Sequence, residues 1–159
     1  MRVYFAHPCF TPEQESFKIE FLAKLREALM ARSGEGDISV MDPFDHSPNV
    51  EHDPEAKVAM SETIKDSCIG LLEECDVVMA LVDDDDTGTA FEAGYAHCMN
   101  MPVILISAGS CDLANAMLLG AAKERFDHVL EAGRMEMLVR TLEWLSLSKD
   151  RLPPSPANN

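Results

Sequence analysis

The stretch DVVMALVDDDDTGTAFEAGYA, residues 76–96, decides the fold of this chain. Its first segment, DVVMALV, is continuously apolar after Asp76, which is typical of a central parallel strand covered on both faces. Four aspartates follow, and the chain then passes through Gly88 into a helix that carries Glu92. Ligands of open α/β sheets bind at the carboxyl edge of the strands, so this unit places Glu92 beside a predicted ligand site.

Strands and helices alternate along the rest of the chain. Short apolar, β-branched or aromatic runs predict further strands at residues 2–6, 38–42, 102–107 and 128–130. Apolar residues at helical spacing predict helices at 12–32, 54–74, 113–119 and 134–147, in addition to the Glu92 helix. Parallel strands need helical crossovers, so the alternation predicts an α/β fold: a flavodoxin-like, five-stranded parallel sheet in the order 2-1-3-4-5, with helices on both faces.

The length of the chain fits one domain. Residues 1–148 are expected to form it, and the composition of residues 149–159 is typical of a disordered tail. Helix caps are recognisable at Thr11-Pro12 with Gln14, and at Asp53-Pro54. The polar loop 43–53 is long enough to line a site. Trp144, in the last predicted helix, is expected to pack on the core.

The charge of the chain argues against several classes of partner. Its 159 residues include 28 acidic and 13 basic ones, and the net charge of −15 repels phosphate backbones and anionic lipid surfaces. Nucleic acid and membranes are therefore not expected as partners. The chain shows neither a secretion signal nor an apolar window long enough to span a membrane, so we expect a cytoplasmic protein. The five cysteines form no C-x-x-C pair, which favours reduced thiols.

The predicted strand order brings two loops together. Strands one and three diverge at the switch point of this order, so the loop 7–10 lies beside the acidic loop, with a cleft between them. The converging segments contain no lysine, no arginine and no glycine-rich phosphate cradle, which argues against a phosphate ligand. The side chains available there are those of Tyr4, His7, Phe10, Asp83 to Asp86 and Glu92.

Several site chemistries lack their motifs in this chain. It has no G-x-G-x-x-G, no P-loop and no G-x-S-x-G, and its five histidines are scattered, so we expect neither cofactor nor metal. Carboxylate chemistry remains: cleavage at an anomeric carbon uses one carboxylate to attack and another to manage the leaving group's proton. A helix start favours ionised Glu92 and hence a nucleophile. The simpler interpretation is a solvated acidic loop with Glu92 as a helix-dipole partner.

Three segments resemble the nucleoside 2-deoxyribosyltransferase family. They are VYFA (3–6), DVVMALVDDDDTGTAFEAGYAHCMNMPVILI (76–106) and NAMLLG (115–120), and the core GTAFExGYA is the most specific part. The resemblance implies the same flavodoxin-like fold and a homo-oligomer built from dimers, commonly a hexamer. It also implies 2′-deoxynucleosides and free purine or pyrimidine bases as substrates.

The resemblance assigns roles to five residues. Glu92 is the nucleophile that attacks C1′, expels the base and forms a deoxyribosyl ester, which a second base cleaves with net retention of configuration. Asp86 holds the sugar hydroxyls, and Gly88 lies with it in the substrate site. Asp66, a protonated carboxyl near the base, donates to the leaving group. Tyr4 orients the nucleophile.

Two further residues complete the implied site. Asn115 crosses a subunit interface to the sugar of the neighbouring site, and Phe10 is a wall on which the base stacks. Each assignment has a simpler structural interpretation. Asn115 caps a short helix, Phe10 and Tyr4 pack in the core, and Asp66 faces solvent on its helix.

Three functions besides base exchange remain open at this point. One is an N-glycosidase that hydrolyses deoxynucleosides or deoxynucleoside 5′-monophosphates. The monophosphate would need a phosphate nest after the first strand, and HPCFT (7–11) is a poor one. The second is a non-catalytic nucleoside-binding module, and the third is a purely structural or interaction protein. Base exchange is the function that the sequence favours.

Overall fold

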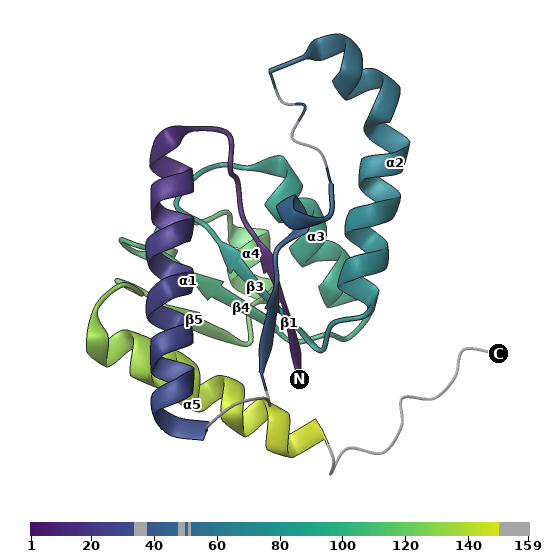
Figure 1. The fold of residues 1–159 in the computed structure, drawn as a ribbon. Helices are drawn as coiled ribbons and strands as arrows, with labels where there is room; N and C mark the ends of the chain where they lie inside the picture. Colours follow the sequence, from purple (N-terminus) through teal and green to yellow (C-terminus); the bar gives the residue numbers. More distant parts are fainter. Residues whose placement is uncertain (34–37, 48–49, 51, 150–159) are drawn as a thin grey trace, which may run out of the picture.

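The computed structural model describes residues 1–33, 38–47, 50 and 52–149. It contains a five-stranded, all-parallel sheet in the order β2-β1-β3-β4-β5, which confirms the predicted flavodoxin-like architecture (Figure 1). The strands are β1 (Arg2–Ala6), β2 (Ser39–Met41), β3 (Val77–Leu81), β4 (Val103–Ile106) and β5 (Glu124–Phe126). Apart from Lys149, the tail that we expected to be disordered lies outside the described residues.

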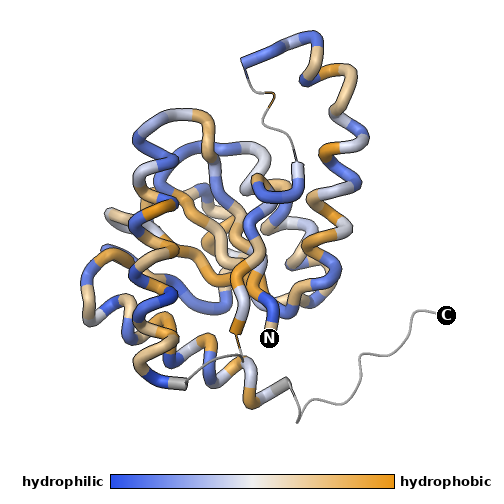
Figure 2. The backbone as a smooth tube through the Cα atoms, in the orientation of Figure 1, coloured by the Kyte–Doolittle hydropathy of each residue, from blue (hydrophilic) through white to orange (hydrophobic). Residues whose placement is uncertain are grey.

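Alternate residues of the central strands pack on opposite faces of the sheet. Val3 and Phe5 belong to the core under α1 (Pro12–Ser33) and α5 (Ala132–Lys149). Tyr4 and Ala6 belong to the core under α2 (Pro54–Glu73), α3 (Thr87–Cys98) and α4 (Ala116–Ala121). Figure 2 shows the hydrophobic residues gathered along the central strands. Tyr4 therefore reaches the face of the sheet on which α3 places Glu92.

Side-chain caps begin the helices that surround the site. The Thr11 amide donates to Gln14 Oε1 at 3.0 Å and the Gln14 amide to Thr11 Oγ1 at 3.3 Å, which is the predicted capping box of α1. Asp53 Oδ1 accepts from the Ala56 amide at 3.0 Å at the start of α2. None of the described helices has the length and apolar character needed to cross a membrane.

Two expectations about the last third of the chain are wrong. The fifth strand is Glu124–Phe126, because residues 127–130 form a turn in which His128 adopts a φ of 50°, outside the β region. Trp144 is 57% exposed and lies under the Lys123 ammonium, 5.4 Å from the ring centroid. It falls outside the buried stripe of α5, which consists of Met135, Leu138, Val139 and Leu142.

The short helix that we predicted at 113–119 is divided in two. A 3-10 helix, η2 (Cys111–Leu113), comes first, and α4 starts only at Ala116. The break lies at Ala114, whose backbone is extended, and at Asn115, whose side chain caps α4.

Helix α2 contacts the rest of the molecule mainly through its C-terminal half. Leu72 is its only residue that is fully buried, among those the structure describes. The N-terminal half extends beyond the sheet (Figure 1), and Val58 there is 78% exposed. One face of this projecting half is therefore available to form a wall of a site.

Candidate active site

A cavity of about 380 Å³ opens at the carboxyl edge of β1 and β3. Its walls come from the loop after β1, the 3-10 helix η1 (Pro43–Asp45) and the residues after it, one face of α2, and the start of α3. Small-molecule sites usually occupy about 300–1,000 Å³. Four residues predicted from the sequence line the cavity: Phe10, Asp86, Gly88 and Glu92.

Asp86 forms the N-cap of α3. Its Oδ2 accepts a hydrogen bond from the Thr89 amide at 2.6 Å, which fixes the carboxylate at the rim of the cavity. A Cβ added to Gly88 would lie 3.2 Å from Asp86 Oδ2. The absence of a side chain at Gly88 therefore lets the carboxylate stay close to the backbone of the first helical turn.

The sequence suggested that the other residues of the acidic loop are solvated, but two of them, Asp83 and Asp84, are hydrogen-bonded within the protein. Asp83 accepts hydrogen bonds from the Ser107 hydroxyl at 2.5 Å and from the Ala108 amide at 2.8 Å. Asp84 accepts from Gln14 Nε2 at 2.9 Å. These bonds tie the acidic loop to the loop after β4 and to α1, so they brace the segment that carries Asp86.

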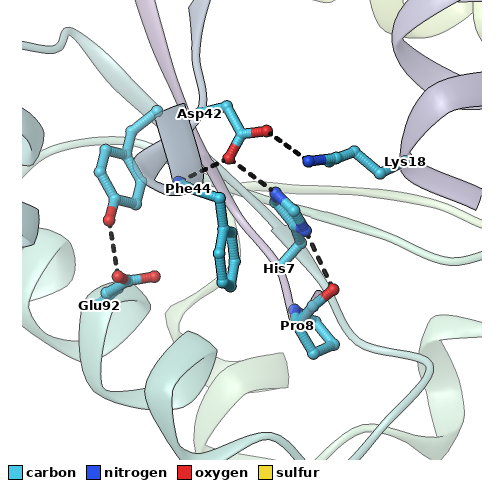
Figure 3. A network of polar contacts seen from close by, with 7 residues as sticks. His7, Pro8, Lys18, Asp42, Phe44 and Glu92 are labelled. Carbon is cyan, nitrogen blue, oxygen red and sulfur yellow. Dashed lines mark hydrogen bonds and ion pairs between the residues drawn. The ribbon is translucent and has the colours of Figure 1, made fainter. Parts of the chain in front are cut away.

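Glu92 on α3 and Tyr4 on β1 form a hydrogen-bonded pair. The Tyr4 hydroxyl donates to Glu92 Oε1 at 2.6 Å, drawn in Figure 3 as the dashed line that ends at Glu92. Tyr4 is fully buried on β1, so its ring is held by the core while its hydroxyl reaches the carboxyl group. The pairing brings together two residues that are 88 positions apart in the sequence.

Burial changes the ionisation of this pair. Removal from water raises the pKa of Glu92 to about 7, and the charge of Asp86 adds to the rise, while the hydrogen bond from Tyr4 opposes it. Burial and the neighbouring carboxylate raise the pKa of Tyr4 far above its usual range, so Tyr4 stays a neutral donor. Our expectation that Glu92 lies at a helix start was wrong, because α3 begins at Thr87 and Glu92 lies beyond its first turn, where no free amide of the helix end stabilises its charge.

One face of α2 forms a second wall of the cavity. The residues that line it recur at helical spacing: Lys57, Ser61, Ile64, Lys65, Cys68 and Ile69. The Cys68 thiol lies close enough to the Tyr4–Glu92 pair for electrostatic interaction with both, and burial, followed by the charge of Glu92, raises its pKa. Cys68 therefore occupies the α2 position next to the Tyr4–Glu92 pair.

The structure does not bring Asp66 to the cavity. Its side chain is 63% exposed and pairs with Lys65 Nζ at 2.6 Å. Asp66 is two residues from Cys68, which places it about 200° around the helix from the thiol. The carboxyl group that the resemblance places near the base is thus absent from this wall among the described residues, and a thiol lies there instead.

The cavity does contain lysines, contrary to the expectation from the sequence. Lys57 and Lys65 both line the α2 wall. The expectation concerned only the loops at the edge of the sheet, whereas these residues come from a helix that projects past that edge. The apolar stripe of Ile64 and Cys68 predicts which face of α2 turns inward, and it would have identified the lysines beside it.

An aromatic corner closes the cavity on the side of the β1 loop. Phe10 and Phe44 lie edge to face, with ring centroids 5.8 Å apart, and both line the cavity. The Phe44 amide donates to Asp42 Oδ1 at 2.9 Å. The backbone that carries Phe44 is therefore held by a buried carboxylate.

Asp42 is the centre of a polar network beneath this corner (Figure 3). Its Oδ1 lies 3.1 Å from His7 Nε2 and its Oδ2 lies 3.2 Å from Lys18 Nζ, while His7 Nδ1 lies 3.0 Å from the Pro8 carbonyl oxygen. Burial alone would raise the pKa of Asp42, but its bonds with His7, the Phe44 amide and Lys18 lower it to about 2. The ionised carboxylate thus joins β1, η1 and α1 below the cavity.

Asn115 lies outside the cavity of its own chain. Its Oδ1 accepts from the Met117 amide at 2.9 Å, so it acts as the N-cap of α4, and its side chain is exposed. Large apolar side chains close to it in the sequence are also exposed, with Leu113 at 87% and Met117 at 83%.

Within the described ranges, no group of three or more potential ligands is arranged to hold a metal ion.

Solved structures share this architecture. A 2-deoxyribosyltransferase from Bacillus psychrosaccharolyticus is similar with a TM-score of 0.62 and 21% identity, covering 85% of this chain and 96% of that one. A conserved protein from Enterococcus faecalis has a TM-score of 0.59 and 18% identity, covering 96% and 99%. A CMP N-glycosidase from Clostridium botulinum has a TM-score of 0.50 and 21% identity, covering 91% and 99%. At these identities the likeness concerns the fold.

Comparisons of sequence give one family. A search of the curated proteins found no match to the chain. The family model described as nucleoside 2-deoxyribosyltransferase matches residues 3–132, which include both β1 with Tyr4 and the acidic loop with Asp86 and Glu92. With most of its length matched by that model, the chain belongs to the nucleoside 2-deoxyribosyltransferase family.

Proposed function

We propose that the protein exchanges the base of a 2′-deoxynucleoside for a free purine or pyrimidine base, with Glu92 as the nucleophile. The observation that carries the proposal is the Tyr4–Glu92 pair, 2.6 Å apart at the inner end of a cavity that Asp86 also lines. A partly desolvated carboxyl group with a fixed donor on one oxygen suits attack on an electrophilic carbon. Family membership supports the same reaction.

The proposed reaction has two displacement steps. Because Tyr4 occupies Oε1 of Glu92, the attack is assigned to Oε2, which forms an ester bond to C1′ as the C1′–N bond breaks and its electron pair leaves with the base. An acceptor base then attacks C1′ through a ring nitrogen and releases the Glu92 carboxylate. Its N–H proton passes to solvent, from which the departed base anion takes up one proton. Two inversions give net retention of configuration.

Other residues of the cavity position the substrate. Asp86, fixed by its bond to the Thr89 amide, accepts hydrogen bonds from the sugar hydroxyls. Phe10 and Phe44 provide the apolar faces for the base. Gly88 keeps the first turn of α3 open to the sugar.

We also propose that the active enzyme is a homo-oligomer. The exposed apolar side chains of Leu113 and Met117 flank Asn115 in the sequence, and burial against a second copy would remove them from water. In such an assembly Asn115 reaches the sugar in the neighbouring site. This supports a dimer-based assembly as the functional unit.

Hydrolysis is the second candidate. Lys57 and Lys65 on the cavity wall favour it, because they supply the cations that would receive the phosphate of a deoxynucleoside 5′-monophosphate and that the loops at the sheet edge lack. In this reaction water replaces the acceptor base in the second step. The two candidates share Glu92 and differ in substrate and acceptor.

A product assay separates the candidates. The protein is incubated with a panel of 2′-deoxynucleosides and a free acceptor base, and in parallel with the corresponding 5′-monophosphates in water. New nucleosides are expected in the first set. Release of free base from the monophosphates alone would establish hydrolysis and exclude exchange.

The nucleophile is tested by intact mass. A 2-fluoro-2-deoxyribosyl nucleoside should leave a sugar adduct on Glu92, since fluorine slows breakdown of the ester. Glu92→Gln is expected to lose the adduct and to reduce turnover by roughly a thousandfold or more. Asp85→Asn, in the exposed part of the same acidic loop, is the control and should behave as wild type. Full turnover by Glu92→Gln would point to a different nucleophile.

A further inference from the structure

The two long walls of the cavity have opposite charge. Asp86 and Glu92 lie on the α3 side, and Lys57 and Lys65 lie on the α2 side. The α2 wall contains no carboxylate among the described residues that line the cavity. The sign of the charge on this wall is thus opposite to the net charge of the chain, which is −15.

The geometry of a displacement reaction places the sugar at the α3 wall and the base at the α2 wall. A nucleophile and its leaving group lie on opposite sides of the carbon under attack, so a base leaves C1′ away from Glu92. Cys68, next to the Tyr4–Glu92 pair, marks the inner end of the α2 wall. Lys65 is three residues nearer the N-terminus of α2, about 4.5 Å along the axis, which is within the span of a base held at C1′.

The polar groups of the α2 wall are mainly donors. Lysine offers three N–H groups and no acceptor, and a thiol is a weak donor. Oxo groups of a base present acceptors to such a wall, whereas the amino group of adenine presents donors. With Asp66 turned to solvent, this wall also lacks a carboxylic acid that would protonate the leaving base.

We infer that the α2 wall selects bases bearing oxo groups, and that Lys65 stabilises the negative charge that such a base carries as it leaves. This inference rests on the proposed base exchange and names its substrate class: 2′-deoxynucleosides of hypoxanthine, uracil and thymine are preferred over 2′-deoxyadenosine. The C1′–N electron pair moves into the base, and its negative charge is delocalised onto the base oxygens. The Lys65 ammonium stabilises this charge by an ionic hydrogen bond. No proton transfer from Asp66 is needed.

The bond between Lys65 and Asp66 does not prevent this role. Both side chains are more than half exposed, at 54% and 63%, and exposed ion pairs of this kind contribute little to stability. The hydrogen bond that Lys65 donates to Asp66, together with the charge of Asp66, raises the pKa of Lys65, so the side chain stays an ammonium ion. Its flexible stem allows the charge to turn from Asp66 to a ligand.

The test compares donors that differ in the base. We would measure kcat/KM for 2′-deoxyinosine, 2′-deoxyuridine, 2′-deoxyuridine 5′-monophosphate and 2′-deoxyadenosine with one common acceptor, in wild type, Lys65→Gln, Lys65→Arg and Lys24→Gln. Lys24 is on α1 and bonds to Glu20 and the Leu130 carbonyl, outside the cavity, so it is the matched control. Lys65→Gln should lower kcat/KM on the oxo-base donors by about tenfold, with little change on 2′-deoxyadenosine. Lys65→Arg should retain the preference.

Three results would overturn the inference. The first is a wild-type preference for 2′-deoxyadenosine, and the second is an equal loss on all donors in Lys65→Gln. The third is a loss confined to 5′-monophosphate donors, which would show that Lys65 binds a phosphate rather than the base.

Failure of the proposed function gives a different pattern. In that case no donor exchanges its base. Calorimetry with free hypoxanthine and adenine then tests the wall directly. Weaker binding of hypoxanthine alone by Lys65→Gln would support the wall assignment without the reaction, whereas unchanged binding of both bases would refute it.

Discussion

Glu92 experiences two opposing influences. Its position at the inner end of the cavity removes water and raises its pKa to about 7, while the Tyr4 hydroxyl stabilises the ionised form. A carboxylate in bulk water is ionised at neutral pH but is shielded by its hydration. In this site the carboxyl group loses its hydration and is partly protonated at neutral pH. Its reactivity therefore depends on pH near neutrality.

The pH dependence follows from the sign of this shift. The nucleophile must be ionised, and its raised pKa means that the protonated form predominates below pH 7. We expect kcat/KM for base exchange to rise with pH through about 7 and then to level off. Tyr4→Phe removes the bond that lowers this pKa, so the midpoint should move higher and the rate at pH 7 should fall about tenfold. A midpoint near pH 4.5 would contradict the desolvation of Glu92.

Asp66 and Cys68 give a second prediction at this scale. Asp66→Asn should retain at least about a third of wild-type kcat/KM, because its exposed carboxylate lies outside the cavity. Cys68→Leu should lower it more, since a larger, branched side chain crowds the inner end of the wall beside the Tyr4–Glu92 pair. Steady-state kinetics of the two variants provide the comparison. A thousandfold loss in Asp66→Asn would restore the role of Asp66 as an acid.

The position of Asp66 outside the cavity shows where spacing along the sequence is a weak guide. The spacing of 20 residues to Asp86 crosses a strand and a loop, and the length of a loop varies without changing the fold. Spacing within a helix is fixed by its geometry, so Ile64 and Cys68 must share a face that Asp66 does not. Residues close to a motif, such as Gly88 and Glu92, were placed correctly at the cavity because little intervenes between them.

At the scale of elements, the segment around η1 shows how a short polar loop is held in place. Asp42 connects this segment to β1 through His7 and to α1 through Lys18, and it bonds the Phe44 amide. The aromatic corner of the cavity therefore depends on a buried ionic network beneath it. Breaking such a network is strongly destabilising, because each remaining partner stays desolvated without its counter-charge.

Removal of Asp42 tests this dependence. Asp42→Ala should reduce the free energy of unfolding by about 3 kcal/mol, since it leaves the buried His7 and the partly buried Lys18 without their carboxylate. Asp45→Ala, at an exposed position in η1, should change it by less than about 0.5 kcal/mol. Urea denaturation followed by circular dichroism measures both. Equal stabilities of the two variants would show that the network contributes nothing.

The same carboxylate has a defined pH window. The pKa of Asp42 is about 2 in the folded protein, below the ordinary aspartate value of 3.8. A lowered pKa stabilises the fold above the unfolded value. This contribution of Asp42 is therefore complete above about pH 4 and is lost as the pH falls towards 2.

Elements set by local sequence were predicted well, and those set by tertiary contacts were not. The capping box of Thr11 and Gln14 and the apolar runs of β3 and β4 are local, and the structure contains them. β5 was misplaced because its exposed edge sequence, with Glu124 and Arg125, lacks an apolar run. The local stripe of Ile64 and Cys68 identifies the face of α2 that carries the lysines, but the projection of α2 beyond the sheet (Figure 1), which brings that face to the cavity, is set by tertiary contacts.

For the whole molecule, the exposed apolar residues near Asn115 predict an assembly. Leu113 and Met117 are the most exposed of the large hydrophobic side chains that the structure describes. Asn115 lies between them in the sequence. Association through this surface would complete the site with a residue from a neighbouring copy.

Disruption of that surface should affect both assembly and activity. Met117→Glu is expected to yield a smaller species by light scattering and to lower base exchange at least tenfold, since a buried unpaired charge opposes association. Met137→Glu, at a half-exposed position on α5, is the matched control and should do neither. A fully active monomer of Met117→Glu would show that Asn115 is not needed from a second copy.

Because α2 projects past the sheet, the two walls of the site differ in local stability. The Glu92 wall rests on the buried core, whereas the lysine wall is carried by a segment with few buried side chains. Amide hydrogen exchange should therefore be fast over residues 54–65 and slow over α3 in the free protein. A bound nucleoside should slow exchange in the first segment most, so that part of the binding free energy goes into ordering the wall that recognises the base.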